Sequence, residues 1–90
     1  MKKEYRLLKN ENFKEVLDKR QSVSRENFVI CYKKNQLTHY RVGISVSSKI
    51  GNSVIRHKIK RQIASMVDQI IDLDTPLDVV VIVRKKYLNN

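Results

Sequence analysis

The sequence is poor in residues that cross-link, break or bend a chain. It has 90 residues, with one cysteine, one proline, two glycines and no tryptophan. A lone cysteine, Cys31, excludes an internal disulfide and a cysteine-based zinc site, so we expect it to be a small apolar strand residue. Because no repeat, linker or low-complexity segment interrupts the chain, we expect residues 1–90 to form one domain.

Long apolar runs are missing as well. The longest aliphatic run, residues 79–83, is far shorter than the roughly 20 residues that a membrane-spanning helix needs. The opening segment, MKKEYRLLKN, carries charge but no apolar core, so we expect no signal peptide. These features predict a cytoplasmic protein that does not enter a membrane.

Acidic residues are scarce relative to basic ones. Lys and Arg number 19 against 9 Asp and Glu, which gives a net charge of +10. This excess favours a polyanionic partner, with nucleic acid ahead of a membrane surface. A domain of this size buries only about 60% of its unfolded surface, so we expect marginal stability that a bound partner would raise.

The apolar pattern predicts an α+β fold, a two-layer α/β sandwich of the order α-β-β-β-α-β. Residues 10–20 are expected to form the first helix, capped by Asn10 and closed by Lys19 and Arg20. The apolar face of this helix consists of Phe13, Val16 and Leu17. Residues 22–35 are strand-like, with a kink near Arg25 and Glu26, and residues 36–39 are expected to turn.

Residues 40–49 alternate between two kinds of side chain, as a half-buried strand does. One face is apolar and predicted to join the core: Tyr40, Val42, Ile44 and Val46. The other face is small and polar, so another group can approach the backbone there: Arg41, Gly43, Ser45 and Ser47.

A second helix is predicted over residues 53–71, followed by a turn at 72–76 and a buried strand at 77–86. The helical period selects an apolar stripe of Ile55, Ile59, Ile63, Met66, Val67 and Ile70. Asn52 or Ser53 can cap this helix.

The first turns of this second helix carry cations where the helix dipole disfavours them. Five of the six positions from 56 to 61 are basic or imidazole side chains: Arg56, His57, Lys58, Lys60 and Arg61. Each misplaced charge costs about 0.3–1 kcal/mol, and acids lie toward the other end at Asp68 and Asp72. An approaching phosphate, held by the free amides and these cations, would resolve the conflict.

Other interpretations of this cluster remain open. The cations can form a solvated face, although the net charge favours a polyanion. Composition does not separate RNA from DNA, and the helix could enter a DNA major groove, but no helix-turn-helix partner is evident.

Catalytic chemistry within the chain itself is poorly supported. Asp72, Asp74 and Asp78 could bind magnesium, but the first two precede Pro76 and suit a turn. His57 is a poor general base because neighbouring cations disfavour its protonated form. We therefore predict no catalytic residue and no metal ligand.

The segment YRVGISVSSKIGNSVIRHKIKRQI, residues 40–63, closely resembles the signature region of the bacterial ribonuclease P protein subunit. The flanking RLLKNENFKEVL and SVSRENFVI also resemble that family's opening. The matching residues are Arg41, Gly43, Ser45, Val46, Ser47, Lys49, Gly51, Asn52, Val54, Arg56, Lys60 and Arg61.

The resemblance implies a protein that binds a large catalytic RNA and helps it remove the 5′ leader of precursor tRNA. Magnesium ions held by that RNA perform the hydrolysis, and no cofactor or obligate protein partner is implied for the chain itself. The implied RNA-binding residues are Arg56, His57, Lys58, Lys60, Arg61, Lys49 and Arg41. The implied leader cleft, where an aromatic ring can stack on a base, comprises Phe13, Leu17, Cys31, Ser45 and Ser47.

The family also implies a left-handed crossover around the second helix, whereas the general expectation is a right-handed one. It implies a C-terminal helix too, which we expect to be short or absent here because the sequence stops at KKYLNN.

The chain departs from the family pattern at several positions: His57, Lys58, Ser48, Ala64, Leu17 and Cys31. Lys58 replaces the usual arginine fork by a point charge. Leu17 and Cys31 stand at cleft positions that are often aromatic, so stacking would depend on Phe13. The alternative function is a ribosomal or other structural RNA-binding protein, which composition and fold class fit equally well.

Overall fold

The computed structural model describes residues 5–84 except 8 and 20. Its elements are α1 (Asn10–Asp18), β1 (Ser22–Ser24), β2 (Phe28–Lys34), β3 (Arg41–Val46), α2 (Ser53–Ile70) and β4 (Leu77–Val83). The predicted α+β class and element order are confirmed. The family's C-terminal helix, which we expect to be short or absent, and the end of the strand predicted over 77–86 fall outside the described residues.

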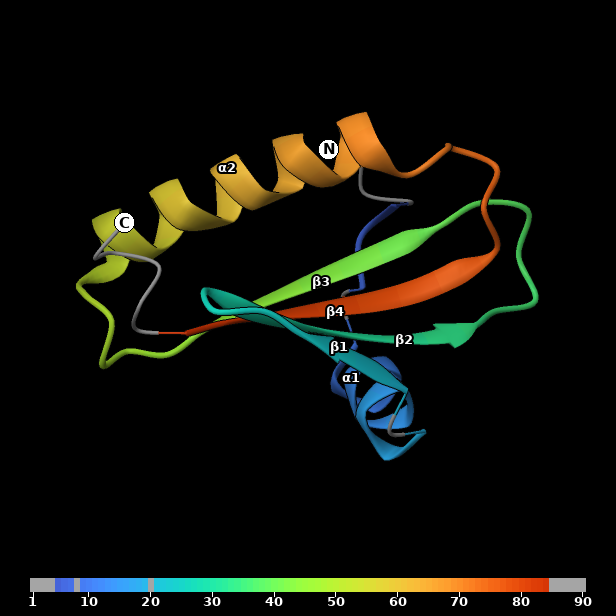
Figure 1. Ribbon diagram of the computed structural model, residues 1–90, viewed down its shortest axis with the longest axis horizontal. Coiled ribbons are helices and arrows are strands. Elements are labelled where there is room, and N and C mark those ends of the chain that lie inside the picture. The colour runs from blue at the N-terminus through green and yellow to red at the C-terminus, as the bar shows by residue number, and fades with distance from the viewer. Residues whose placement is uncertain (1–4, 8, 20, 85–90) are drawn as a thin grey trace.

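The four strands form one mixed sheet in the order β1-β2-β4-β3 (Figure 1). β1 with β2 and β2 with β4 are antiparallel, whereas β3 and β4 are parallel. The parallel pair makes α2 a crossover connection from one end of the sheet to the other. Its predicted left-handed sense stays a prediction.

The two helices lie on opposite faces of the sheet (Figure 1). This layering differs from the predicted two-layer sandwich, because the sheet is covered on both sides. The reason lies in β4, whose run VVVIV is apolar at successive positions: Val79, Val81 and Val83 pack in the α2 cluster, and Val80 in the α1 cluster. A strand that is apolar on both faces needs a cover on each.

The larger cluster lies under α2, which meets the sheet through Ile59, Ile63 and Val67, spaced four residues apart. The stripe is narrower than predicted, since Ile55, Met66 and Ile70 are 39%, 40% and 77% exposed. A straight helix resting on a sheet buries one row of side chains, and the flanking positions turn toward solvent.

The smaller cluster lies under α1 and consists of Leu7, Val16, Cys31 and Val80. Asn10 is not the cap of α1 as predicted, because the carbonyl of Lys9 already accepts the amides of Asn12 and Phe13. Lys9 is thus the N-cap, and its side chain makes no capping bond.

α1 is also shorter than the predicted helix over residues 10–20. It ends at Asp18, with Lys19 as the C-cap and no basic residue in the last turn. Arg20 lies outside the described residues.

The kink predicted near Arg25 is a complete reversal. β1 and β2 form a hairpin whose turn is closed by the amide of Arg25 donating to the carbonyl of Phe28 over 2.8 Å. On the other side of the molecule, residues 40–46 alternate as predicted, with Tyr40 and Val42 buried under α2.

Candidate nucleic-acid interface

The start of α2 is a well-formed helix terminus without any acid in its first turn. The side-chain oxygen of Asn52 accepts the amide of Ile55 over 3.0 Å, which identifies Asn52 rather than Ser53 as the cap. Because the cap satisfies only part of the first turn, the positive end of the helix dipole faces outward. The structure therefore places the predicted cations on an already positive terminus.

Four of those cations are exposed on the first three turns of α2: His57, Lys58, Lys60 and Arg61. Arg56 differs, because it flanks the buried Ile59–Ile63 row and is only partly exposed. Its Nε atom is buried and has no hydrogen-bond partner among the described residues. Arg56 therefore borders the apolar stripe, whereas the other four side chains lie away from it.

A groove of about 410 Å³ opens at the outer edge of β3, between α1 and α2. We call it the α1–α2 groove. Its cationic wall comes from His57, Lys60 and Arg61 of α2 together with Arg6, and its aromatic wall is Phe13 of α1. Leu7, Val42, Gly43, Ile44 and Ala64 complete the lining. Phe13 and the basic helix, predicted as separate sites, thus share one groove.

The position of Phe13 depends on Gly43. A Cβ on Gly43 would lie 2.6 Å from Cε1 of Phe13 and closer still to Cζ, so the ring occupies the space that a side chain would fill. The small polar face predicted for β3 therefore lets a group approach the backbone as expected, but that group is the protein's own ring. Phe13 remains partly exposed.

The other predicted cleft residues do not line this groove. Cys31 is buried in the cluster beneath α1, as its apolar flanks suggested. Leu17 is 42% exposed on the same helix. Ser45 and Ser47 are exposed, and the Ser47 hydroxyl accepts the amide of Lys49, itself exposed after β3.

Sequence reasoning missed two lining residues, Arg6 and Leu7. The amide of Leu7 donates to the carbonyl of Val42 over 2.9 Å, and Arg6 bridges Val42, so this segment runs beside β3. The only local signal for Arg6 and Leu7 was that a basic residue stands next to an apolar one at the start of RLLKN.

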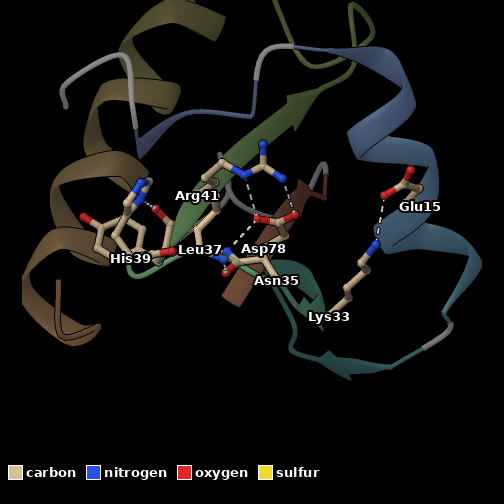
Figure 2. A network of polar contacts seen from close by, with 8 residues as sticks. Glu15, Lys33, Asn35, Leu37, His39, Arg41 and Asp78 are labelled. Atoms are coloured by element: carbon tan, nitrogen blue, oxygen red, sulfur yellow. Dashed lines mark hydrogen bonds and ion pairs between the residues drawn. The ribbon is translucent and has the colours of Figure 1, made fainter. Parts of the chain in front are cut away.

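Arg41 is paired with an acid, whereas the exposed cations of α2 have no ion-pair partner among residues 5–84 without 8 and 20. Its Nε donates to Oδ1 of Asp78 over 2.9 Å and its Nη2 to Oδ2 over 2.7 Å (Figure 2). Asn35 donates to the same carboxylate over 2.9 Å and also to the carbonyl of His39, while its own oxygen accepts the amide of Leu37. This network ties the β2–β3 connection to the start of β4.

Burial alone would raise the pKa of Asp78. Hydrogen bonds from Arg41 and Asn35, with the positive charges of Arg41 and Lys33, outweigh burial and lower this pKa below its ordinary value. The bond to Asp78 raises the pKa of Arg41 in turn. Asp78 is thus an anion committed to Arg41.

The alternative of a magnesium site at Asp72, Asp74 and Asp78 finds no support. Across residues 5–84 without 8 and 20, no three His, Cys, Asp or Glu side chains gather to hold a metal ion. Asp72 instead accepts the amide of Thr75 through its carbonyl, as a turn residue.

Among residues 5–84 without 8 and 20, no helix has the length and apolar character to span a membrane.

Comparison with known proteins identifies the family. The family profile for Ribonuclease P matches residues 1–90. The chain belongs to the ribonuclease P protein family. A ribonuclease P protein component from an Exiguobacterium strain is 45% identical over 85 residues, which cover 94% of this chain and 75% of the relative. One from Mesoplasma florum is 42% identical over 92 residues, which cover 100% of this chain and 84% of the relative.

Solved ribonuclease P proteins share the fold. The Staphylococcus aureus protein superposes with a TM-score of 0.84 at 38% identity, covering 96% of this chain and 80% of that one. The Thermotoga maritima protein gives 0.79 at 32% identity, covering 90% and 74%. As a ribonuclease P protein component, the chain is part of an endoribonuclease that processes tRNA, which decides against the ribosomal alternative.

Proposed function

We propose that this ribonuclease P protein binds the catalytic RNA and the 5′ leader of precursor tRNA, and that the RNA subunit cleaves the precursor tRNA. The α1–α2 groove carries this proposal, because it joins a partly exposed aromatic ring to four potential phosphate ligands. Rings that stack on bases beside cations that bind phosphates are the usual means of holding single-stranded RNA.

The leader is assigned to the groove. Phe13 offers its ring to an unpaired base, while His57, Lys60 and Arg61 lie within reach of the adjoining phosphates. Leu17, Cys31, Ser45 and Ser47 lie outside the groove lining, so we assign them no direct contact with the leader.

The catalytic RNA is assigned to the outer face of α2 and the turn before it. Lys58 and Lys49 are exposed there, and Arg56 is partly exposed, with a buried Nε that has no hydrogen-bond partner among the described residues. Arg41 contributes least, because Asp78 occupies two of its donors.

Magnesium enters this proposal through the RNA subunit, and the protein holds none itself. Cationic side chains along the interface screen repulsion between RNA strands, so the protein should lower the magnesium concentration that cleavage requires. Because the protein must meet both RNAs, we propose that it acts in the cytoplasm.

Truncating Phe13 tests the leader assignment. We expect Phe13→Ala in the reconstituted holoenzyme to weaken binding of precursor tRNA by about 5- to 150-fold, the range for losing one stacked base. Binding of mature tRNA should hardly change, because it has no leader. Leu17→Ala is the matched control, since Leu17 lies on the same helix outside the groove lining.

An equal loss for both tRNAs, together with a large fall in melting temperature, would assign Phe13 to the core instead.

A second test asks whether the RNA subunit or the protein carries out cleavage. The chain without the RNA subunit should cut nothing, and magnesium-dependent cleavage abolished by Asp72→Ala would contradict the proposal.

A further inference from the structure

A second hollow lies at the opposite edge of the sheet from the α1–α2 groove. It has a volume of about 410 Å³ and is lined by Lys19, Gln21, Tyr32, Lys33, Lys34 and Leu77. We call it the β2-edge hollow. It combines an aromatic ring with three lysines, although none of these residues belongs to the sites described above.

The hollow exists because β2 is longer than its outer neighbour. β1 pairs with β2 only as far as Ser22 opposite Cys31, and the next bond across this edge is the amide of Tyr32 donating to the carbonyl of Gln21. Lys33 and Lys34 continue β2 beyond that point, paired on their inner side with β4. The α1–α2 groove arises in the same way, where β3 continues past the segment that contains Leu7.

The three lysines of the hollow differ in whether they form an ion pair within the described part of the chain. Lys33 binds Glu15 of α1 over 2.8 Å, and its side chain is only 22% exposed (Figure 2). Lys19 and Lys34 are exposed and form no ion pair within the described part of the chain. Two positive charges therefore remain available in the hollow that Tyr32 also lines, where Tyr32 is partly exposed and packs against the cluster under α2.

We propose that the β2-edge hollow is a second binding surface for single-stranded RNA, with Tyr32 against a base and Lys19 and Lys34 on phosphates. This rests on the proposed function, which supplies RNA as the polyanion. Neighbouring strands lie about 4.8 Å apart, so β4 separates the edges by roughly 10 Å. The two surfaces are thus independent, and their contributions to binding should add.

Lysines on an open strand edge also have a simpler explanation, since they prevent edge-to-edge pairing between molecules. That role requires positive charge along β2 but no aromatic ring and no lysine from the α1 end. Lys19 comes from the end of α1, and Tyr32 lines the hollow beside it. This convergence from separate elements favours a ligand.

The test compares two double variants of equal charge in the reconstituted holoenzyme. Lys19→Gln with Lys34→Gln removes the two available charges, and Lys9→Gln with Lys14→Gln removes two exposed lysines outside both hollows. The affinities for the catalytic RNA alone, and for precursor tRNA with a short or a long leader, are measured as a function of salt concentration. The first variant should lower the slope of log K against log salt by about 1.4, the value for two single-strand phosphates.

A reduced slope for the catalytic RNA, or one confined to the long leader, supports the proposal and identifies which RNA occupies the hollow. Equal slopes for both double variants in every arm overturn it. Tyr32→Leu should weaken binding at least fivefold where Tyr32→Phe does not, because only the phenylalanine retains a ring. Equal affinities for these two single variants would likewise overturn it.

A parallel variant, Lys60→Gln with Arg61→Gln, separates this inference from the proposed function. If it loses affinity while the Lys19 and Lys34 variant does not, only the second surface is wrong. If neither variant loses affinity, the proposed function itself is wrong.

Discussion

The two faces of the sheet are covered to very different extents. Among the described residues, nine buried side chains form one cluster under α2, whereas the cluster under α1 has four. The thin α1 face leaves Phe13 partly exposed and Leu17 on the surface. Stability therefore depends mainly on the α2 face, while the α1 face keeps apolar surface available for a ligand.

The helices that cover these faces also differ in their electrostatics. α1 has an acid, Glu11, in its first turn, as the dipole favours, whereas α2 has none. The cations that open α2 face solvent and the groove, but Asp68 near its other end has an internal partner, the hydroxyl of buried Tyr40. The acid near the end of α2 thus contributes to packing, whereas the cations at its start belong to the proposed RNA-binding surface.

The largest effect should follow from removing a charge where β3 and β4 begin. Arg41→Ala leaves Asp78, only 2% exposed, without its cation, and such losses cost about 3–5 kcal/mol. Urea unfolding near neutral pH measures the loss. Lys49→Ala removes an exposed cation nearby in sequence and should change stability by less than about 0.5 kcal/mol.

The same pair has a distinct pH dependence. The folded-state pKa of Asp78 lies below its ordinary 3.8, so its stabilisation is full above that value and is lost as pH falls through the folded pKa. In Arg41→Ala, burial would instead raise this pKa, so the gap between variant and wild type should narrow from about pH 7 to about pH 3. A constant gap would show that Arg41 stabilises by packing alone.

Core truncations compare the two faces directly. Ile63→Ala, on the α2 face, should destabilise by about 2–5 kcal/mol, and Val16→Ala, on the α1 face, by about 2 kcal/mol for two lost methyl groups. At a temperature where both variants are folded, only Val16→Ala should change the preference for precursor over mature tRNA, because it supports the helix that carries Phe13. Equal changes in that preference would remove the distinction between the faces.

Gly43→Ala should disturb the groove more than the fold. The added methyl group displaces the ring of Phe13, and overpacking of this kind costs about 1–3 kcal/mol. Adding Phe13→Ala removes the clash, so the double variant should be more stable than the sum of the single losses implies. Strict additivity would show that the two residues do not compete for the same space, and Ser45→Ala serves as the exposed control on the same strand.

The smallest effect should come from Tyr40→Phe. It removes the hydroxyl that donates to Asp68 but keeps the buried ring, so about 1 kcal/mol should be lost. Burial, followed by the bond to Asp68, raises the pKa of Tyr40 to about 12. The wild-type phenol should therefore stay protonated in spectroscopic titration well above its ordinary range, and titration near pH 10 would contradict this.

Local patterns were enough to predict much of this molecule. The helical period identified α2, with its two ends within one residue, and the twofold alternation identified the buried and polar faces of β3. Both periods repeat within a few residues, so they are readable without knowing what packs against them. The inverted charges at the start of α2 and the family signature that contains them are also local.

Tertiary packing determined which residues are buried and which distant residues pair, and neither the helical nor the strand period reveals this. Ile55, Met66 and Ile70 have the same periodicity as the buried residues of α2, yet only the row that meets the sheet is covered. Arg41 and Asp78 are 37 residues apart and pair because β3 and β4 are parallel neighbours in register. The same long-range pairing brings Phe13 to the basic start of α2, because the position of a side chain across a sheet depends on strand order rather than on its own neighbours in the chain.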